Sequence, residues 1–304
     1  MAELYRNYKR RIEELKKERN AIILAHLYQR PEVQDIADFT GDSLDLSRKA
    51  IATNAEVIVF CGVRFMAETA YILNPGKIVL LPEKDAGCPL ADMAEVEQLK
   101  KKKSQYPNAA VVSYVNSSAA LKAESDICCT SANAVDVINS LPQKQILFLP
   151  DRNLGSYVAE KTDKEIILWP GYCYVHEKNI NTNKLRDLKQ RYQNARIMIH
   201  PECSPEVIGL ADYVGSTSQM LKYAEKSEVK EFIVGTEDGL IHRLQKENPN
   251  KKFYPLNTVC KDMKITDLKS VVTALEKMRY KISIPDNICI KAKRALDKML
   301  ELKI

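Results

Sequence analysis

The sequence lacks the features of membrane and secreted proteins. None of its apolar runs approaches the roughly 20 residues that a bilayer-spanning helix requires. The first residues, MAELYRNYKRRIEELKKERN, follow a charged helical pattern, whereas a signal peptide has an apolar core. We therefore expect a cytoplasmic protein with no membrane partner.

Pairs of the Cys-x-x-Cys type are also absent, although the chain has eight cysteines. This absence excludes the usual zinc-ribbon and thioredoxin signatures, and a reducing compartment argues against a disulfide framework. Metal ligation, catalysis and plain burial remain. A lone cysteine after a buried strand is usually structural, and we predict that role for five of the eight. These five are Cys61, Cys128, Cys129, Cys203 and Cys289.

No part of the chain concentrates charge of one sign over a long stretch. The net charge of +6 arises from 46 basic and 40 acidic residues, mixed along most expected helices. A nucleic-acid-binding protein usually gathers positive charge on one face with aromatic partners. We expect a solvated surface and no nucleic-acid partner, with the excess charge helping to attract an anionic substrate.

Three copies of one pattern occupy most of the chain. Short apolar runs end at His26, Tyr114 and His200, at steps of 88 and then 86 residues. Seventeen residues beyond each landmark lies a hydroxyl residue, and a small residue followed by aspartate lies between the two. The hydroxyl residues are Ser43, Ser131 and Thr217, and the aspartates are Asp38, Asp126 and Asp212.

Two further apolar runs follow in each copy, and amphipathic helical patterns separate them. Continuous runs of this kind indicate parallel strands buried on both faces and joined by right-handed crossovers. The expected strands lie at 21–26, 56–60 and 77–82, at 110–114, 145–149 and 165–170, and at 196–200, 231–235 and 252–256.

The predicted fold class is therefore α/β, with three homologous three-layer domains. Each has a small parallel sheet of three strands, and the domains lie about a pseudo-threefold axis. We place the repeats at 1–105, 106–192 and 193–280, and a C-terminal helix, capped near Asp286, at 281–304. Ligands of parallel sheets bind at the carboxyl ends of the strands, so one shared central active site is expected.

Cys88, Cys173 and Cys260 follow the third strand of each repeat. They lie 45, 42 and 43 residues beyond the three hydroxyl residues. Thiolates prefer soft or borderline metals, and recurrence in three copies predicts joint ligation of one metal centre on the axis. Three thiolates without a fixed fourth ligand form an open site, which suits catalysis. An iron-sulfur cluster with one free iron and a zinc ion both fit this ligand set.

The hydroxyl residues stand where loops enter helices. An N-cap is the ordinary role of such a residue. Three helix starts directed into one pocket would also bind anions, because free backbone N–H groups and the helix dipoles favour carboxylate or phosphate there. We expect Ser43, Ser131 and Thr217 to serve both purposes, and the substrate to be small and multiply anionic.

Four side chains at the strand ends are candidates for proton transfer: His26, Tyr114, His200 and Glu202. Their convergence beside an open metal suggests acid-base chemistry. Asn116 can orient a polar substrate group. His176 and His242 are weaker candidates, because neither has a counterpart in the other repeats.

At these residues the chain resembles the quinolinate synthase (quinolinate synthetase A) family over nearly its whole length. The matching tracts are AHLYQ, GDS, DAGCPLADM, SYVNS, ESDICCTSANA, WPGYCYVHE, HPEC, GSTSQM and NTVCKDM. Any one of these tracts is modest evidence, whereas all of them in order are strong evidence.

The resemblance implies a transferase of NAD (pyridine nucleotide) biosynthesis from aspartate. Such an enzyme condenses iminoaspartate (iminosuccinate) with dihydroxyacetone phosphate to give quinolinate, phosphate and water. The resemblance also implies an oxygen-sensitive [4Fe-4S] cluster on Cys88, Cys173 and Cys260, with one iron open to substrate. Tyr114, Glu202, His26 and His200 would be catalytic. Substrate contacts would come from His26, Tyr28, Ser43, Tyr114, Asn116, Ser131, His200, Pro201, Glu202 and Thr217. Functional coupling to the enzyme that supplies iminoaspartate is a further expectation.

Two rival hypotheses remain. A non-catalytic iron-sulfur protein for electron transfer normally has four cysteine ligands and a shielded cluster, whereas three equivalent cysteines occur here. A zinc lyase would use the same three thiolates to hold its Lewis acid.

Overall fold

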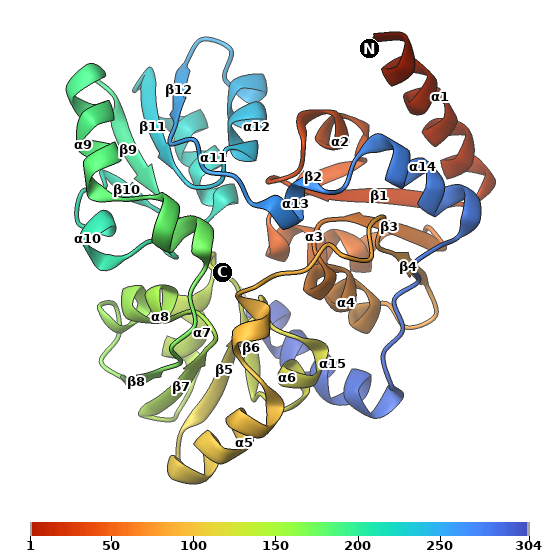
Figure 1. Ribbon diagram of the computed structural model, residues 1–304. Coiled ribbons are helices and arrows are strands. Elements are labelled where there is room, and N and C mark those ends of the chain that lie inside the picture. The colour runs from red at the N-terminus through yellow and green to blue at the C-terminus, as the bar shows by residue number, and fades with distance from the viewer. Residues whose placement is uncertain (1, 303–304) are drawn as a thin grey trace.

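The computed structural model describes residues 2–302 and shows three parallel α/β units around a common centre (Figure 1). Each unit contains one four-stranded sheet. The first has β1 (Ala21–His26), β2 (Phe39–Gly41), β3 (Val57–Cys61) and β4 (Ile78–Leu80). The second has β5 (Ala110–Tyr114), β6 (Ile127–Cys129), β7 (Gln145–Leu149) and β8 (Glu165–Leu168). The third has β9 (Arg196–Ile199), β10 (Tyr213–Val214), β11 (Glu231–Gly235) and β12 (Lys252–Pro255).

The strand order is the same in all three sheets: β2-β1-β3-β4, β6-β5-β7-β8 and β10-β9-β11-β12, all parallel. The nine predicted strands and the pseudo-threefold arrangement are confirmed. The prediction of three strands per unit is wrong, because β2, β6 and β10 add a fourth. These strands have three, three and two residues, too short to register as apolar runs.

Helices cover both faces of each sheet. The first unit has α1 (Ala2–Glu18), α2 (Pro31–Ile36), α3 (Ser43–Ala52) and α4 (Arg64–Leu73). The second has α5 (Val96–Gln105), α6 (Ala119–Ala123), α7 (Ala134–Ser140) and α8 (Arg152–Ala159). The third has α9 (Thr182–Arg191), α10 (Pro205–Ile208), α11 (Thr217–Lys226) and α12 (Gly239–Glu247). After β12 come α13 (Lys261–Lys264), α14 (Leu268–Lys277) and α15 (Asp286–Glu301).

Burial on both faces explains why the strands are continuous apolar runs. In β3, Val57 and Val59 belong to the core beneath α1 and α14, whereas Ile58 and Phe60 belong to the core beneath α3 and α4. Alternate side chains of a strand point to opposite faces, so a strand covered on both sides must be apolar at every position.

The repeated aspartates do the same work in each unit. Asp38, Asp126 and Asp212 each accept a hydrogen bond from a backbone N–H of the first strand, at Ile23, Val111 and Ile197, and all three distances are 2.8 Å. Each aspartate N–H also donates to the carbonyl of that strand residue. The carboxylate therefore fixes the turn that leads into the short extra strand.

The last two helices break the threefold pattern. Helix α14 packs against α1 of the first unit, and α15 packs against α6 and β6 of the second unit (Figure 1). A C-terminal helix is present at Asp286–Glu301, inside the predicted segment 281–304, whose residues 303–304 lie outside the described part of the chain; no side chain caps this helix, and Asp286 is its first residue. The predicted boundaries after residues 105, 192 and 280 stay predictions.

Candidate active site

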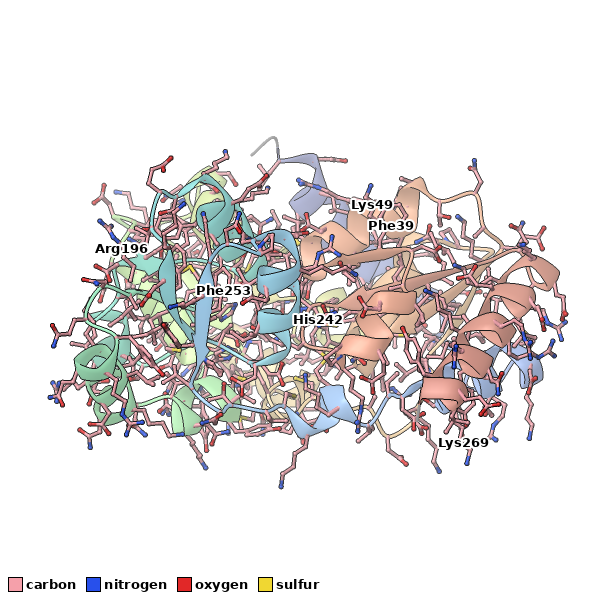
Figure 2. The ribbon with its side chains drawn as sticks, turned by 90° about the horizontal axis from the view of Figure 1, so that it is seen from above. Phe39, Lys49, Arg196, His242, Phe253 and Lys269 are labelled. Atoms are coloured by element: carbon pink, nitrogen blue, oxygen red, sulfur yellow. The ribbon has the colours of Figure 1, made fainter. Side chains whose placement is uncertain are left out.

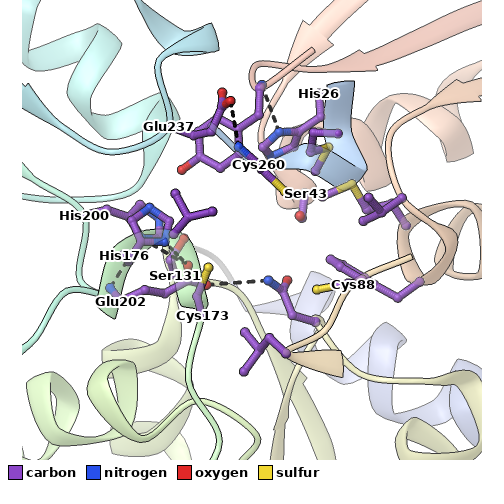
Figure 3. A pocket seen from close by; sticks show the side chains of 18 of the residues that line it. His26, Ser43, Cys88, Ser131, Cys173, His176, His200, Glu202, Glu237 and Cys260 are labelled. Carbon is purple, nitrogen blue, oxygen red and sulfur yellow. Dashed lines mark hydrogen bonds and ion pairs between the residues drawn. The ribbon is translucent and has the colours of Figure 1, made fainter. Parts of the chain in front are cut away.

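A buried cavity lies where the three units meet, at the carboxyl ends of their sheets (Figure 3). In each sheet the second strand lies on one side of the first strand and the third and fourth strands lie on the other, so the strand order reverses beside the first strand; such switch points are where doubly wound sheets bind ligands. The cavity measures about 70 Å³, and one water needs only ~10–15 Å³. It therefore has room for a small ligand.

Almost every residue predicted for the site lines this cavity. They are His26, Tyr28, Ser43, Cys88, Tyr114, Asn116, Ser131, Cys173, His200, Glu202, Thr217 and Cys260. Pro201 is the exception among the described residues, since it is not part of the lining. The structure therefore brings together groups from positions 26 to 260 of the chain.

The three candidate ligand cysteines have equivalent surroundings. Each precedes a short helical turn: a 3₁₀ turn at Ala91–Met93, a π-helical turn at Val175–Asn179, and α13. In each case the backbone N–H three residues on, at Ala91, His176 and Met263, acts to lower the pKa of the thiol. These donors favour a thiolate, as helix N-termini do elsewhere.

Burial acts in the opposite direction on these thiols. It raises the pKa of Cys88, Cys173 and Cys260 above the ordinary thiol value. A bound metal cation would overcome this, because a coordinating thiol loses its proton. All eight cysteines are free, and Cys61, Cys128, Cys129 and Cys203 are fully buried in the packed units.

Two carboxylates behind the cysteines were missed by the sequence analysis. Asp151 accepts the Cys173 N–H at 3.1 Å, and Glu237 accepts the Cys260 N–H at 3.1 Å. Both carboxylates lie two residues beyond the end of the second long strand of their unit, where the first unit has Val63. An acidic residue at this place in two copies out of three was the available signal.

His26 and His200 use their rings in the same way. The Tyr28 N–H donates to Nδ1 of His26 at 3.1 Å, and the Glu202 N–H donates to Nδ1 of His200 at 3.3 Å. Burial lowers the pKa of both rings to about 3. Both are therefore neutral at physiological pH and carry their proton on Nε2, as donors for a ligand in the cavity.

Acidification is expected to destabilise the protein through these two histidines. The folded pKa is about 3, and the unfolded value is about 6.5. Between these values the unfolded chain binds more protons, so the free energy of unfolding falls as the pH is lowered from about 6.5. His200→Gln should flatten this dependence, measured by denaturant unfolding from about pH 4.5 to 7.5.

The control is His242→Gln. This variant removes a partly exposed histidine that is bonded to Asp35 between α2 and α12 (Figure 2). An unaltered pH dependence in His200→Gln would contradict the assignment.

Glu202 and Tyr114 hold complementary protonation states. Burial alone would raise the pKa of Glu202, but His176, His200 and a hydrogen bond with Tyr114 lower it to about 2. Burial, together with the Glu202 charge, raises the pKa of Tyr114 well above its usual value. Glu202 is therefore a carboxylate that accepts protons, and Tyr114 keeps a proton that it can donate.

His176 was predicted to be a weaker candidate, and the structure corrects this. Its side chain is 1% exposed, its Nδ1 lies 2.6 Å from Oε2 of Glu202, and its ring stacks on His200 at 4.6 Å between centroids. Its Nε2 lies 2.9 Å from Oγ1 of Thr236, which in turn lies 2.5 Å from the hydroxyl of Tyr28. A polar chain thus runs from Glu202 to Tyr28. The repeat pattern could not reveal this polar chain, because His176 and Thr236 have no equivalents in the other two units.

The helix starts differ from the predicted caps. Asp42 caps α3 and Ser216 caps α11. Ser43 and Thr217 are therefore the first helical residues and line the cavity, while Ser131 lies in the turn before α7. The caps also join the units, since Ser216 Oγ donates to Asp42 at 3.1 Å and Gln219 Nε2 donates to the Ala132 carbonyl at 3.2 Å.

Three α/β units that close on a cavity with thiol, imidazole and carboxylate groups define an enzyme built around a candidate metal centre. A family model described as quinolinate synthetase A protein matches residues 10–301. The chain is 54% identical to the quinolinate synthase of Methanosarcina barkeri over 296 residues, 97% of each chain. It is 55% identical to that of Dehalococcoides mccartyi over 294 residues, 96% of this chain and 97% of the relative. The chain therefore belongs to the quinolinate synthetase A family.

No helix within residues 2–302 is long and apolar enough to cross a membrane.

Proposed function

We propose that the protein condenses iminoaspartate with dihydroxyacetone phosphate to form quinolinate, with release of phosphate and water, in NAD biosynthesis from aspartate. The reaction balances without an oxidant or reductant. The family membership and the cavity in which three cysteines meet a carboxylate, a tyrosine and three histidines support this proposal. The single observation that carries it is the convergence of Cys88, Cys173 and Cys260 on one cavity from three units.

The donor set fits a [4Fe-4S] cluster. Three sulfurs from separate units line the cavity, a backbone N–H near each sulfur lowers the pKa of the thiol, and Oδ1 of Asn116 is buried without a hydrogen-bond partner in the described chain. Cys88, Cys173 and Cys260 would hold three irons. When bound, such a cluster supplies a Lewis acid at its fourth iron, which polarises substrate oxygen and nitrogen atoms.

The other cavity residues suit anionic substrates. His26 and His200 offer neutral N–H donors, which bind carboxylates without taking up their own protons. The first residues of α3 and α11, Ser43 and Thr217, add hydroxyl groups and free backbone N–H groups at positive helix ends. These groups would orient the carboxylates and the phosphate.

Proton transfers fall to two neighbouring side chains. Glu202 would accept a proton from carbon or nitrogen during isomerisation and ring closure, and Tyr114 would donate one to a leaving hydroxyl. Nδ2 of Asn116 lies 3.5 Å from Oε1 of Glu202 and would hold this carboxylate toward the substrate. Tyr28, joined to Glu202 through Thr236 and His176, would close one side of the cavity.

The experiment is an anaerobic assay with iminoaspartate generated in place and dihydroxyacetone phosphate added, followed by detection of the pyridine dicarboxylate. We expect quinolinate only when both substrates and an intact cluster are present. Exposure to air should remove activity, and reconstitution with iron and sulfide should restore it. A colourless zinc protein, or activity indifferent to oxygen, would contradict the proposal.

A cytoplasmic location and coupling to the enzyme that supplies iminoaspartate are part of the same proposal.

A further inference from the structure

Three residues on one wall of the cavity form a compact ligand set of their own. The Sγ of Cys173, a ring nitrogen of His176 and a carboxylate oxygen of Glu202 all lie within 4.8 Å of one another. Figure 3 shows them grouped apart from Cys88 and Cys260. His176 and Glu202 are 1% and 3% exposed, so neither has bulk water as a partner.

The orientation of His176 points to a ligand. Its Nδ1 faces Oε2 of Glu202 at 2.6 Å and makes no other polar contact in the described part of the chain, so a metal ion would take the place of the proton between these two atoms. Its Nε2 lies against Thr236, and metal-binding histidines commonly use their second nitrogen in this way. Asp151 fixes the Cys173 backbone through its N–H, and Asn116 approaches the other oxygen of Glu202.

The chemistry of the set matches a single zinc ion. Catalytic zinc sites combine three protein ligands of the Cys, His and carboxylate types with one open position. Zinc bond lengths of about 2.0 to 2.3 Å place tetrahedral ligand atoms roughly 3.3 to 3.6 Å apart. The separation between His176 and Glu202 is 2.6 Å, below that range, and all three ligand atoms lie within 4.8 Å of one another. Small side-chain rotations would reach it.

We propose that Cys173, His176 and Glu202 bind one divalent transition-metal ion, with zinc preferred, in protein that lacks the cluster. The inference rests on the proposed function in one respect, because Cys173 is also a proposed cluster ligand. One sulfur cannot complete both sites, so the divalent ion and the cluster exclude each other. Zinc would therefore block cluster assembly on protein from which the cluster has been removed. It would also be coordinated by Glu202.

The test uses Co²⁺ as a visible substitute for zinc. The double variant Cys88→Ala/Cys260→Ala keeps this ligand set but has lost two cluster ligands. We expect it to bind one Co²⁺ per chain with a thiolate charge-transfer band. Adding His176→Gln or Glu202→Gln should weaken Co²⁺ binding by more than ~100-fold, because loss of even an outer partner costs about 10- to 100-fold. His26→Gln, a histidine of the same cavity outside the set, is the matched control.

Binding that survives His176→Gln or Glu202→Gln, or that fails in the double variant, would overturn the inference. X-ray absorption of Zn²⁺-loaded wild-type apoprotein gives a second readout that needs no variant. One sulfur among the ligands supports the site, whereas three sulfurs refute it. Iron and sulfide uptake by the same double variant tests the proposed cluster separately, since uptake of a full cluster there would contradict the proposed function alone.

Discussion

Replacing Cys88, Cys173 or Cys260 by alanine, one at a time, is expected to abolish cluster assembly and quinolinate formation. Each sulfur comes from a different unit, so no neighbouring thiol on the same loop can take its place. Loss of the Lewis acid removes several kcal/mol of transition-state stabilisation, a fall of at least ~10³-fold in rate. Iron and sulfide per chain after anaerobic reconstitution, with turnover measured on the same sample, checks this.

Cys289→Ala is the matched control for these variants. Cys289 lies in α15, is partly exposed and does not line the cavity. It should therefore retain full iron content and turnover. Normal iron content and product formation in any one of the three ligand variants would remove that cysteine from the centre.

Tyr114→Phe is expected to keep the cluster yet lower kcat by about 10²- to 10⁴-fold, as is typical of a lost acid-base group. Tyr114 ends β5 and is 5% exposed, and its raised pKa keeps the phenol protonated beside the Glu202 carboxylate. Phenylalanine preserves the packing of the ring but cannot donate a proton. Single-turnover and steady-state rates on protein of equal iron content check the effect.

Tyr157→Phe provides the comparison, because Tyr157 lies on α8 and is not part of the cavity lining. This variant should turn over at the wild-type rate. Wild-type turnover by Tyr114→Phe at full iron content would mean that another group supplies the proton.

Much of the fold could be predicted because the three units repeat. Their apolar runs are buried on both faces, so each long strand is visible as a continuous run, such as AIILAH and QILFL. The fourth strands were missed because two or three residues fixed by an aspartate carboxylate leave no periodic pattern. The docking of α14 on α1 was also outside reach, since it depends on contacts between residues about 260 positions apart, such as Arg11 with Glu276.

The candidate site divides in the same way. Residues that recur in the repeats, such as Cys88 and His200, could be found by comparing the copies. His176 could not be found in this way, because it has no counterpart in the other repeats, whereas Asp151 and Glu237 recur in two copies of the three and were missed. Symmetry thus places equivalent thiols around the axis, whereas asymmetric side chains bring a polar chain to Glu202 alone.

The most direct test of the central claim is the Mössbauer spectrum of anaerobic protein reconstituted with ⁵⁷Fe. Three cysteine ligands around a four-iron cluster predict one iron that differs from the other three, and its signal should shift when quinolinate is added. Four equivalent irons, or a spectrum unchanged by quinolinate, would contradict a cluster whose free iron binds the reactant.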